Sequence, residues 1–170
     1  TNSLGCTYSE DYFVSASNLN NFLISSLDVS CYGGNNGQAF IYPGDSYTYT
    51  WNTTPIQTTS HVTNLLAGTY NYTVTDANGC LHSGSVTITE PSVLTISESV
   101  SDVLCNGDND GSAVLSITGG TPTYLEDWSG VNPTLLSTGV YPYSVTDANG
   151  CLHSGSVTIN EPLPLSVNIL

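Results

Sequence analysis

An internal repeat is the feature that most constrains the fold of this chain. The block VTDANGCLHSGSVTI occupies residues 74–88 and recurs without a change, 71 positions later, at residues 145–159. A Glu-Pro pair follows each block, and a Cys-x-Gly-x-x-x-Gly pattern precedes each. A fixed period of this size is typical of an array of small units that stack on one another.

The repeat also predicts the domain boundaries. Residues 18–91 and 92–162 form two whole repeats in this interpretation. Residues 1–17 correspond to the last strand of a preceding repeat, because Gly-Cys recurs there in register. Residues 163–170 correspond to the first strand of a following repeat.

The pattern of side chains inside each repeat favours strands. Residues 83–89 and 141–146 alternate Val, Ile or Tyr with small or polar residues, and Asp-Ala-Asn-Gly is a strong hairpin signal. No helical stripe exceeds two turns. We therefore expect an all-β fold of tandem, small, Ig-like antiparallel β-sandwiches, with six or seven strands each. The connection between repeats is short, which favours an elongated, semi-rigid array.

The charge of the chain excludes several classes of function. The 170 residues include 14 acidic side chains and no Lys or Arg, for a net charge of −14. Nucleic-acid binding depends on cationic side chains that neutralise phosphates, so we expect no nucleic-acid partner. No apolar stretch is long enough for a transmembrane helix, so we expect no membrane insertion. No nucleophile motif supports an enzyme.

The second repeat carries a longer pattern of cysteine, glycine and aromatic positions that ends in Val-Thr-Asp-Ala-Asn-Gly-Cys and Glu-Pro. These positions are Cys105, Gly107, Gly111, Gly119, Gly120, Tyr124, Trp128, Leu136, Gly139, Tyr141, 145–151, Glu161 and Pro162. The pattern resembles the SprB-type repeat of Bacteroidota cell-surface proteins, a family that includes gliding adhesins. The resemblance extends over essentially the whole chain.

The resemblance implies an extracellular, filamentous adhesin at the cell surface, exported by type IX secretion and acting in adhesion and gliding. The repeats would serve as its shaft, with neighbouring repeats and surface polysaccharide as partners, and without a catalytic residue or cofactor. Two alternatives stay open. The chain is a carbohydrate-binding module, or it is a subunit that polymerises by donating a strand to its neighbour.

Five cysteines indicate an oxidising compartment and disulfide bonds. If each repeat closes on itself, Cys31 bonds to Cys80 and Cys105 bonds to Cys151, and the partner of Cys6 lies outside the chain. Two other pairings fit the spacing, namely Cys31 with Cys151 and Cys80 with Cys105.

The number of strands between the cysteines decides among these pairings. Four intervening strands place both cysteines of a repeat at one end of the sandwich, which the short segment after Trp128 favours. Five intervening strands place them at opposite ends, beyond the roughly 7 Å that a disulfide spans between Cα atoms. In that case Cys31 bonds to Cys151 of the next repeat.

A weak calcium-site candidate lies in the turn at Asp108 and Asp110, because calcium prefers several oxygen ligands in a flexible loop. The alternative is a plain Gly/Asn turn, since the first repeat has Asn at the corresponding positions. Calcium is the single cofactor that we consider.

Aromatic side chains offer a weak binding candidate. Tyr47 and Tyr49 lie on one strand face and are expected at the surface, where they would stack on a sugar. Trp51 and Trp128 are expected in the cores. The largest difference between the repeats, residues 52–67 against 129–138, is the expected lateral contact or ligand surface.

Overall fold

The computed structural model describes residues 22–42 and 46–167, and within these ranges it has eleven strands and no helix. The all-β prediction is confirmed. The strands are β1 (Leu23–Leu27), β2 (Gly37–Tyr42), β3 (Thr48–Trp51), β4 (His61–Leu65), β5 (Gly68–Thr75), β6 (Leu81–Ile88), β7 (Thr95–Ser101), β8 (Ser112–Thr118), β9 (Leu125–Asp127), β10 (Gly139–Thr146) and β11 (Leu152–Ile159).

Strands β1 to β6 form the first unit, which has two antiparallel sheets of order β1-β2-β4 and β3-β5-β6. Burial alternates along β2 and β3, so every second side chain points into one core. Trp51 is the largest side chain in this core and has no exposed surface. Two sheets that share one apolar core are consistent with a β-sandwich.

Strands β7 to β11 form the second unit, with sheets β7-β8 and β11-β10-β9 around a core that contains Trp128. It has five strands, one fewer than the lower expected number. The place of β4 is taken by an isolated bridge between Gly111 and Leu136 and by a hydrogen bond of 2.8 Å from Ala113 N to Pro133 O. The segment after Trp128 is shorter than its counterpart, which leaves no length for a strand there.

Each unit contains the same long hairpin, β5-β6 or β10-β11, in the same register. Tyr72 lies opposite Gly84, and Tyr143 lies opposite Gly155. A Cβ atom on either glycine would clash with the tyrosine oxygen, so the ring packs over a strand position that has no side chain. Burial and a hydrogen bond to Glu98 raise the pKa of Tyr143 to about 12.

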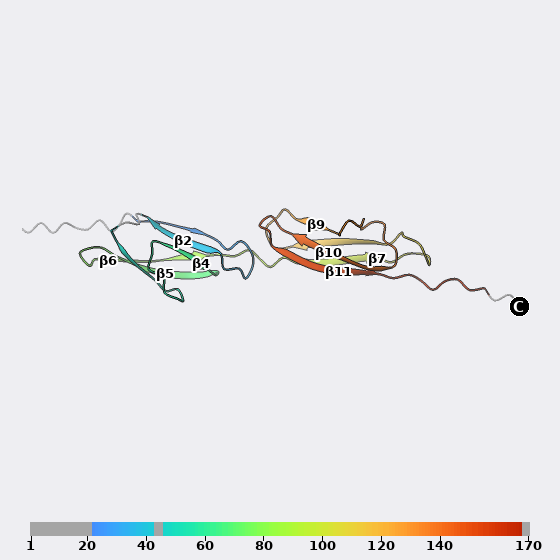
Figure 1. The fold of residues 1–170 in the computed structure, drawn as a ribbon, viewed down its shortest axis with the longest axis horizontal. Helices are drawn as coiled ribbons and strands as arrows, with labels where there is room; N and C mark the ends of the chain where they lie inside the picture. The colour runs from blue at the N-terminus through green and yellow to red at the C-terminus, as the bar shows by residue number, and fades with distance from the viewer. Residues whose placement is uncertain (1–21, 43–45, 168–170) are drawn as a thin grey trace, which may run out of the picture.

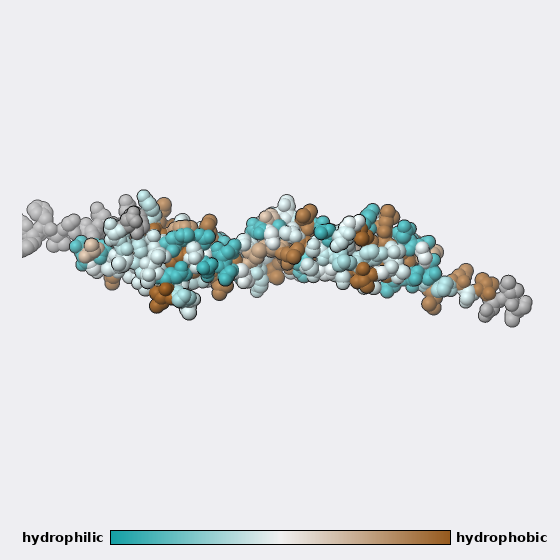
Figure 2. Space-filling model, in the orientation of Figure 1, coloured by the Kyte–Doolittle hydropathy of each residue, from teal (hydrophilic) through white to brown (hydrophobic). Residues whose placement is uncertain are grey.

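The two units lie end to end along the longest axis of the molecule (Figure 1). The chain passes between them through Glu90 and Pro91, and Leu94 already belongs to the core of the second unit. Gly120 N donates a hydrogen bond of 2.8 Å to Ser92 O, which ties this connection to the second unit. The face in Figure 2 is mostly polar or neutral, with short apolar patches and an apolar stretch in the C-terminal extension.

The described part of the chain contains no helix long and apolar enough to cross a membrane. The predicted segment 1–17, with Cys6, lies outside the described residues. The predicted boundaries at 18–91, 92–162 and 163–170 stay a prediction, although each core cluster falls within one of the two whole repeats.

The contact between Tyr143 and Gly155 makes a testable prediction. Gly155 has no left-handed backbone angle, so an alanine there is unfavourable for steric reasons alone. We expect Gly155→Ala to lower the free energy of unfolding by about 1–3 kcal/mol, because the ring of Tyr143 must move. Chemical denaturation measures this, and Ser154→Ala on the opposite strand face is the control, with a change of less than about 0.5 kcal/mol. An equal effect of both variants would contradict the proposed packing.

Candidate functional site at the junction of the two units

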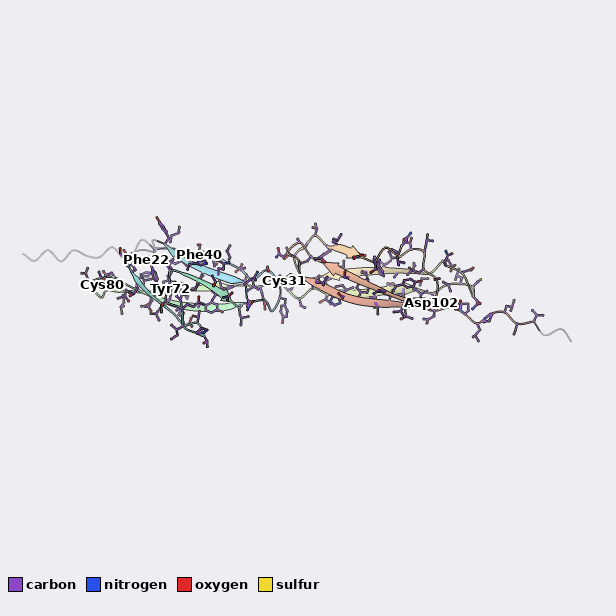
Figure 3. All side chains as sticks on the ribbon, viewed as in Figure 1. Phe22, Cys31, Phe40, Tyr72, Cys80 and Asp102 are labelled. Atoms are coloured by element: carbon purple, nitrogen blue, oxygen red, sulfur yellow. A yellow bond between two sulfur atoms is a disulfide. The ribbon has the colours of Figure 1, made fainter. Side chains whose placement is uncertain are left out.

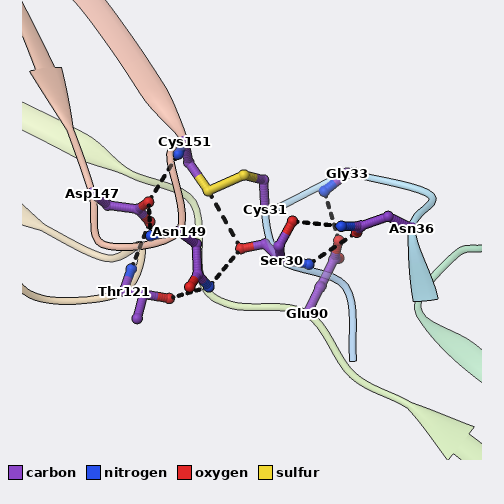
Figure 4. Close-up of a disulfide and its surroundings, with 9 residues drawn as sticks. All are labelled: Ser30, Cys31, Gly33, Asn36, Glu90, Thr121, Asp147, Asn149 and Cys151. Atoms are coloured by element: carbon purple, nitrogen blue, oxygen red, sulfur yellow. Dashed lines mark hydrogen bonds between the residues drawn. A yellow bond between two sulfur atoms is a disulfide. The ribbon is translucent and has the colours of Figure 1, made fainter. Parts of the chain in front are cut away.

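A disulfide bond between Cys31 and Cys151 joins the two units across their junction (Figure 4). Cys31 lies in the loop between β1 and β2, and Cys151 lies at the tip of the β10-β11 hairpin. Their Cα atoms are 5.6 Å apart, although 120 positions separate them in the sequence. This distance is in the usual range for a disulfide. The junction is therefore covalent at two places, the main chain and this bond.

This pairing corrects the expected bonds within each repeat. Cys31 does not bond to Cys80, and Cys105 does not bond to Cys151, because Cys80 and Cys105 are both free and exposed. Figure 3 shows the reason, since Cys80 lies at the outer end of the first unit and Cys31 lies at the junction. The alternative in which Cys31 bonds to Cys151 is the one that the structure has.

The path of the chain between β3 and β4 explains the correction. Asn52 N bonds to Asn71 O in the middle of β5, and Ser60 O accepts from Ile41 N at the outer end of β2. The segment between Asn52 and Ser60 therefore runs back along the unit without forming a strand. The chain crosses the unit once more than the strand count suggests, which places Cys31 and Cys80 at opposite ends.

The side chain of Asn149 connects the two units beside the disulfide. Its Nδ2 donates one hydrogen bond of 3.0 Å to Ser30 O in the first unit and another of 3.0 Å to Thr121 Oγ1 in the second. The Sγ atom of Cys151 lies 3.3 Å from the same carbonyl oxygen of Ser30. Ser30 thus presents its backbone, not its side chain, to the hairpin of the next unit.

Asp147 holds the hairpin tip that carries Asn149 and Cys151. It is buried, its Oδ1 accepts from the backbone N of Asn149 and of Cys151 at 2.9 Å, and its Oδ2 accepts from Thr121 N at 2.7 Å. Burial alone would raise the pKa of Asp147, but these backbone donors, together with Gly150 N, hold it below its ordinary value of 3.8. The ionised carboxylate therefore fixes the shape of the tip.

Carboxylate and amide groups hold the loop of Cys31 on the other side of the junction. Gly33 N donates to Glu90 Oε2 at 2.6 Å, which ties the loop to the connecting segment. Asn36 Oδ1 accepts from Ser30 N at 3.0 Å, and its Nδ2 donates to Ser30 Oγ at 2.7 Å. The carbonyl of Ser30 is thus fixed in the direction of the second unit (Figure 4).

A groove of about 380 Å³ lies at this junction. We name it the junction groove. It is lined by Cys31, Tyr32, Ser92, Val93, Leu94, Gly120, Gly150, Cys151, Leu152 and His153. Cys31 and Tyr32 belong to the loop of the first unit, Ser92 and Val93 belong to the connecting segment, and the others belong to the second unit.

The calcium candidates Asp108 and Asp110 lie in the loop after Cys105, and both are exposed. Asp110 Oδ1 accepts from Leu104 N at 3.1 Å, which is the same contact that Asn36 makes with Ser30 in the first unit. Among the described residues, no group of three or more His, Cys, Asp or Glu side chains is placed to hold a metal ion. Calcium binding by Asp108 and Asp110 stays a prediction.

The surface position expected for Tyr49 is wrong. Tyr49 is 4% exposed and belongs to the first core with Trp51, so it does not present a ring to a sugar. Tyr47 is half-buried against the same core, and its ring meets that of Phe22 with centroids 5.1 Å apart. The buried positions expected for Trp51 and Trp128 are confirmed.

Sequence reasoning identified the cysteines of the site but not the residues that orient them. The sequence pattern indicates only that Asp147 and Asn149 belong to a hairpin and that Glu90 belongs to the repeated Glu-Pro pair. The signal that could have found them is the recurrence of Asp-Ala-Asn-Gly-Cys and Glu-Pro with unchanged spacing to a cysteine. Many other sequences form a hairpin turn, so the recurrence of Asp-Ala-Asn-Gly-Cys points to a requirement beyond the turn itself.

One family is found by comparison with known proteins. The model of the SprB repeat family matches residues 97–133, which confirms the resemblance over this part of the second repeat. The SprB repeat is a structural, adhesin-type repeat of cell-surface proteins and not an enzyme family. A search of curated proteins gives no significant match to the chain.

The lowered pKa of Asp147 predicts acid sensitivity of the hairpin. A group whose pKa is lower in the folded state stabilises the fold above its unfolded-state pKa, and this contribution is lost as the pH falls through the folded-state value. We expect the free energy of unfolding to decrease as the pH drops below about 4. The decrease should be smaller in Asp147→Asn, whose free energy of unfolding is already lower than that of the parent chain at pH 7. Urea denaturation from pH 7 to pH 2.5 measures both. Asp108→Asn, at the other end of the unit, is the control and should follow the parent chain. An unchanged acid dependence in Asp147→Asn would refute this role.

The contact of Asp110 predicts which substitutions the loop tolerates. Asn36 makes the same hydrogen bond with an amide oxygen, so Asp110→Asn should leave the thermal midpoint unchanged. Asp110→Ala should lower the free energy of unfolding by about 0.5–1.5 kcal/mol, because the Leu104 N–H loses its partner. Thermal unfolding with calcium and with EDTA completes the test. If calcium raises the thermal midpoint of the parent chain but not that of Asp110→Asn, the result would instead establish the calcium site.

Proposed function

We propose that this chain is a structural shaft segment of an extracellular bacterial adhesin or surface filament, and that it acts in surface adhesion and gliding motility. The observation that carries the proposal is the disulfide between Cys31 and Cys151, which links two consecutive units and not two strands of one unit. A bond in this position limits how far the units separate.

The position of the bond relative to the chain ends supports a load-bearing role. Strand β1 enters the loop of Cys31, and strand β11 leaves the hairpin tip of Cys151. Tension on the two ends of the chain passes from β1 through the disulfide to β11. The residues between the two cysteines are then protected from extension, even if their strands separate.

The sheet order supports a small Ig-like sandwich as the unit of the shaft. In the first unit β1-β2-β4 shares its core with β3-β5-β6, and the chain crosses between the two sheets after β2, after β3 and after β4. The second unit repeats the hairpin β10-β11 and the packed Trp128. We propose that the two units are tandem copies of one such sandwich, with boundaries near Pro91 and Pro162.

The family and the disulfide together support a location outside the cell. The SprB repeat occurs in cell-surface adhesins, and stable disulfides form in oxidising compartments. Export by type IX secretion and an origin in the Bacteroidota follow from the same resemblance as parts of the proposal. The proposed shaft needs no cofactor, and its partners are neighbouring repeats.

The carbohydrate-binding alternative receives less support from the described residues. Trp51, Trp128 and Tyr49 are buried in the two cores, so they do not form a stacking surface for sugar rings. Residues 52–67 and 129–138 remain the segments in which the two repeats differ most.

A measurement of extension under force tests the proposal. The chain is held by peptide tags at its two termini and stretched in an optical trap, oxidised and then reduced. The bond encloses 120 residue steps, which at roughly 3.4 Å each amount to about 400 Å of chain. We expect the oxidised chain to be shorter by this length after full unfolding.

Two variants make the measurement specific. Cys151→Ser should reach the length of the reduced chain without a reductant, whereas Cys80→Ser should behave as the parent does. If the oxidised parent extends as far as the reduced one, the disulfide does not limit extension and the shaft proposal is overturned.

A further inference from the structure

A second groove lies at the outer end of the second unit, where no other part of the described chain covers it. We name it the end groove. It measures about 380 Å³ and is lined by Leu104, Cys105, Asn106, Pro162, Leu163, Pro164 and Leu165. Leu104 is 79% exposed, and Leu163 and Leu165 are both more than 90% exposed. A soluble chain rarely leaves so many leucines uncovered in one place.

The end groove is the repeat counterpart of one side of the junction groove. Cys105 corresponds to Cys31, and residues 162–165 correspond to 91–94, the connecting segment. In the junction groove the remaining wall is the hairpin tip of the following unit, with Gly150 and Cys151. The end groove has the wall made by the cysteine loop and the segment 162–165, and it lacks the wall made by a hairpin tip.

Hydrogen bonds hold the loop of Cys105 in the same shape as the loop of Cys31. Gly107 N donates to Glu161 Oε2 at 3.0 Å, as Gly33 N does to Glu90. Leu104 N donates to Asp110, as Ser30 N does to Asn36. The group that Ser30 presents to the next unit is its backbone carbonyl, so the change to Leu104 keeps the acceptor.

The matching hairpin is present at the opposite end of the molecule. Asp76 Oδ1 accepts from Asn78 N and Cys80 N, both at 2.8 Å, as Asp147 does from Asn149 and Cys151. Cys80 is free and exposed at this tip, which Figure 3 places at the outer end of the first unit. The sequence of this hairpin is identical to the one that docks at the junction.

We propose that the end groove binds the Cys80 hairpin of a second copy of this chain, and that Cys105 and Cys80 form the bond that Cys31 and Cys151 form inside the molecule. Asn78 of the docked copy takes the place of Asn149 and donates to the carbonyl of Leu104. The inference rests on the proposed shaft function and gives it a partner, because the described residues include an end groove and a free hairpin that matches it. Docking of one on the other joins two copies head to tail.

The bond forms by thiol–disulfide exchange with a small-molecule disulfide. The thiolate of Cys105 attacks this disulfide and releases one small thiol, and the thiolate of Cys80 then attacks the mixed disulfide and releases the second. Two protein thiols are oxidised to one disulfide, and one small disulfide is reduced to two thiols. Docking favours this bond because it holds the two sulfur atoms at a high effective concentration.

Two complementary variants of the full chain test the pairing, both with Cys6→Ser. One also carries Cys80→Ser and keeps Cys105, and the other also carries Cys105→Ser and keeps Cys80. Each is incubated alone, and both are mixed in equal amounts, with oxidised glutathione as the disulfide. Non-reducing mass spectrometry measures the dimers, with the two variants distinguished by an isotope label.

We expect the mixed dimer to form about tenfold faster than either dimer of one variant, because only the mixed pair has a groove and a hairpin. A peptide map of the mixed dimer should contain the Cys105–Cys80 bond. Asn78→Ala in the variant that keeps Cys80 should slow the mixed dimer severalfold, and Asn132→Ala, away from both ends, should not.

Random pairing of two exposed thiols predicts that the mixed dimer is half of all dimers. That ratio, or the absence of any dimer, would overturn the docking proposal. Neither result affects the force measurement on the single chain, so the failure of the docking and the failure of the shaft function are distinguishable.

Discussion

Hydrogen bonds from backbone N–H groups to carboxylates are the interaction on which the ends of both units depend. The chain has no Lys or Arg, and several of its acidic side chains accept hydrogen bonds from the main chain instead. Such charge-assisted bonds are stronger than those between neutral groups. They recur at equivalent places in the two repeats, which indicates that the acids are there to shape loops. The equivalent pairs are Asp28 and Asp102, Asp76 and Asp147, and Glu90 and Glu161.

The geometry of the junction depends on these hydrogen bonds, because a different carboxylate fixes each of its two sides. Glu90 fixes the loop that carries Cys31, and Asp147 fixes the hairpin that carries Cys151. Neither side depends on the other for its conformation, so each cysteine is held in place by the hydrogen bonds on its own side of the junction. The stabilisation by the disulfide is then mainly a restriction of the unfolded chain, about 4–5 kcal/mol for a loop of this length. The same independence is why both outer ends of the molecule have the conformation of the junction.

The repeat could be predicted because the same residues recur directly in the sequence. The strands and the buried tryptophans could be predicted because the alternation of side chains along a strand, with a period of two, is a local property of the sequence. The disulfide pairing could not, because residues 52–60 recross the first unit without a strand pattern, and one extra crossing reverses the end at which Cys80 lies. The burial of Tyr49 was available from the sequence. Residues 49 and 51 lie on the same face of a strand, so a core position for Trp51 already placed Tyr49 in the core. The role of Asn149 depends on a carbonyl 119 positions away, which no local pattern reveals.

The bond between Cys31 and Cys151 closes a covalent ring that includes most of both units. A protease that cleaves one peptide bond anywhere from Tyr32 to Gly150 opens this ring and leaves the two fragments attached to each other. The chain is severed only by a cut outside the ring or by two events, a cut within it and the reduction of the disulfide. Tolerance to a single nick is a form of durability that is separate from thermodynamic stability.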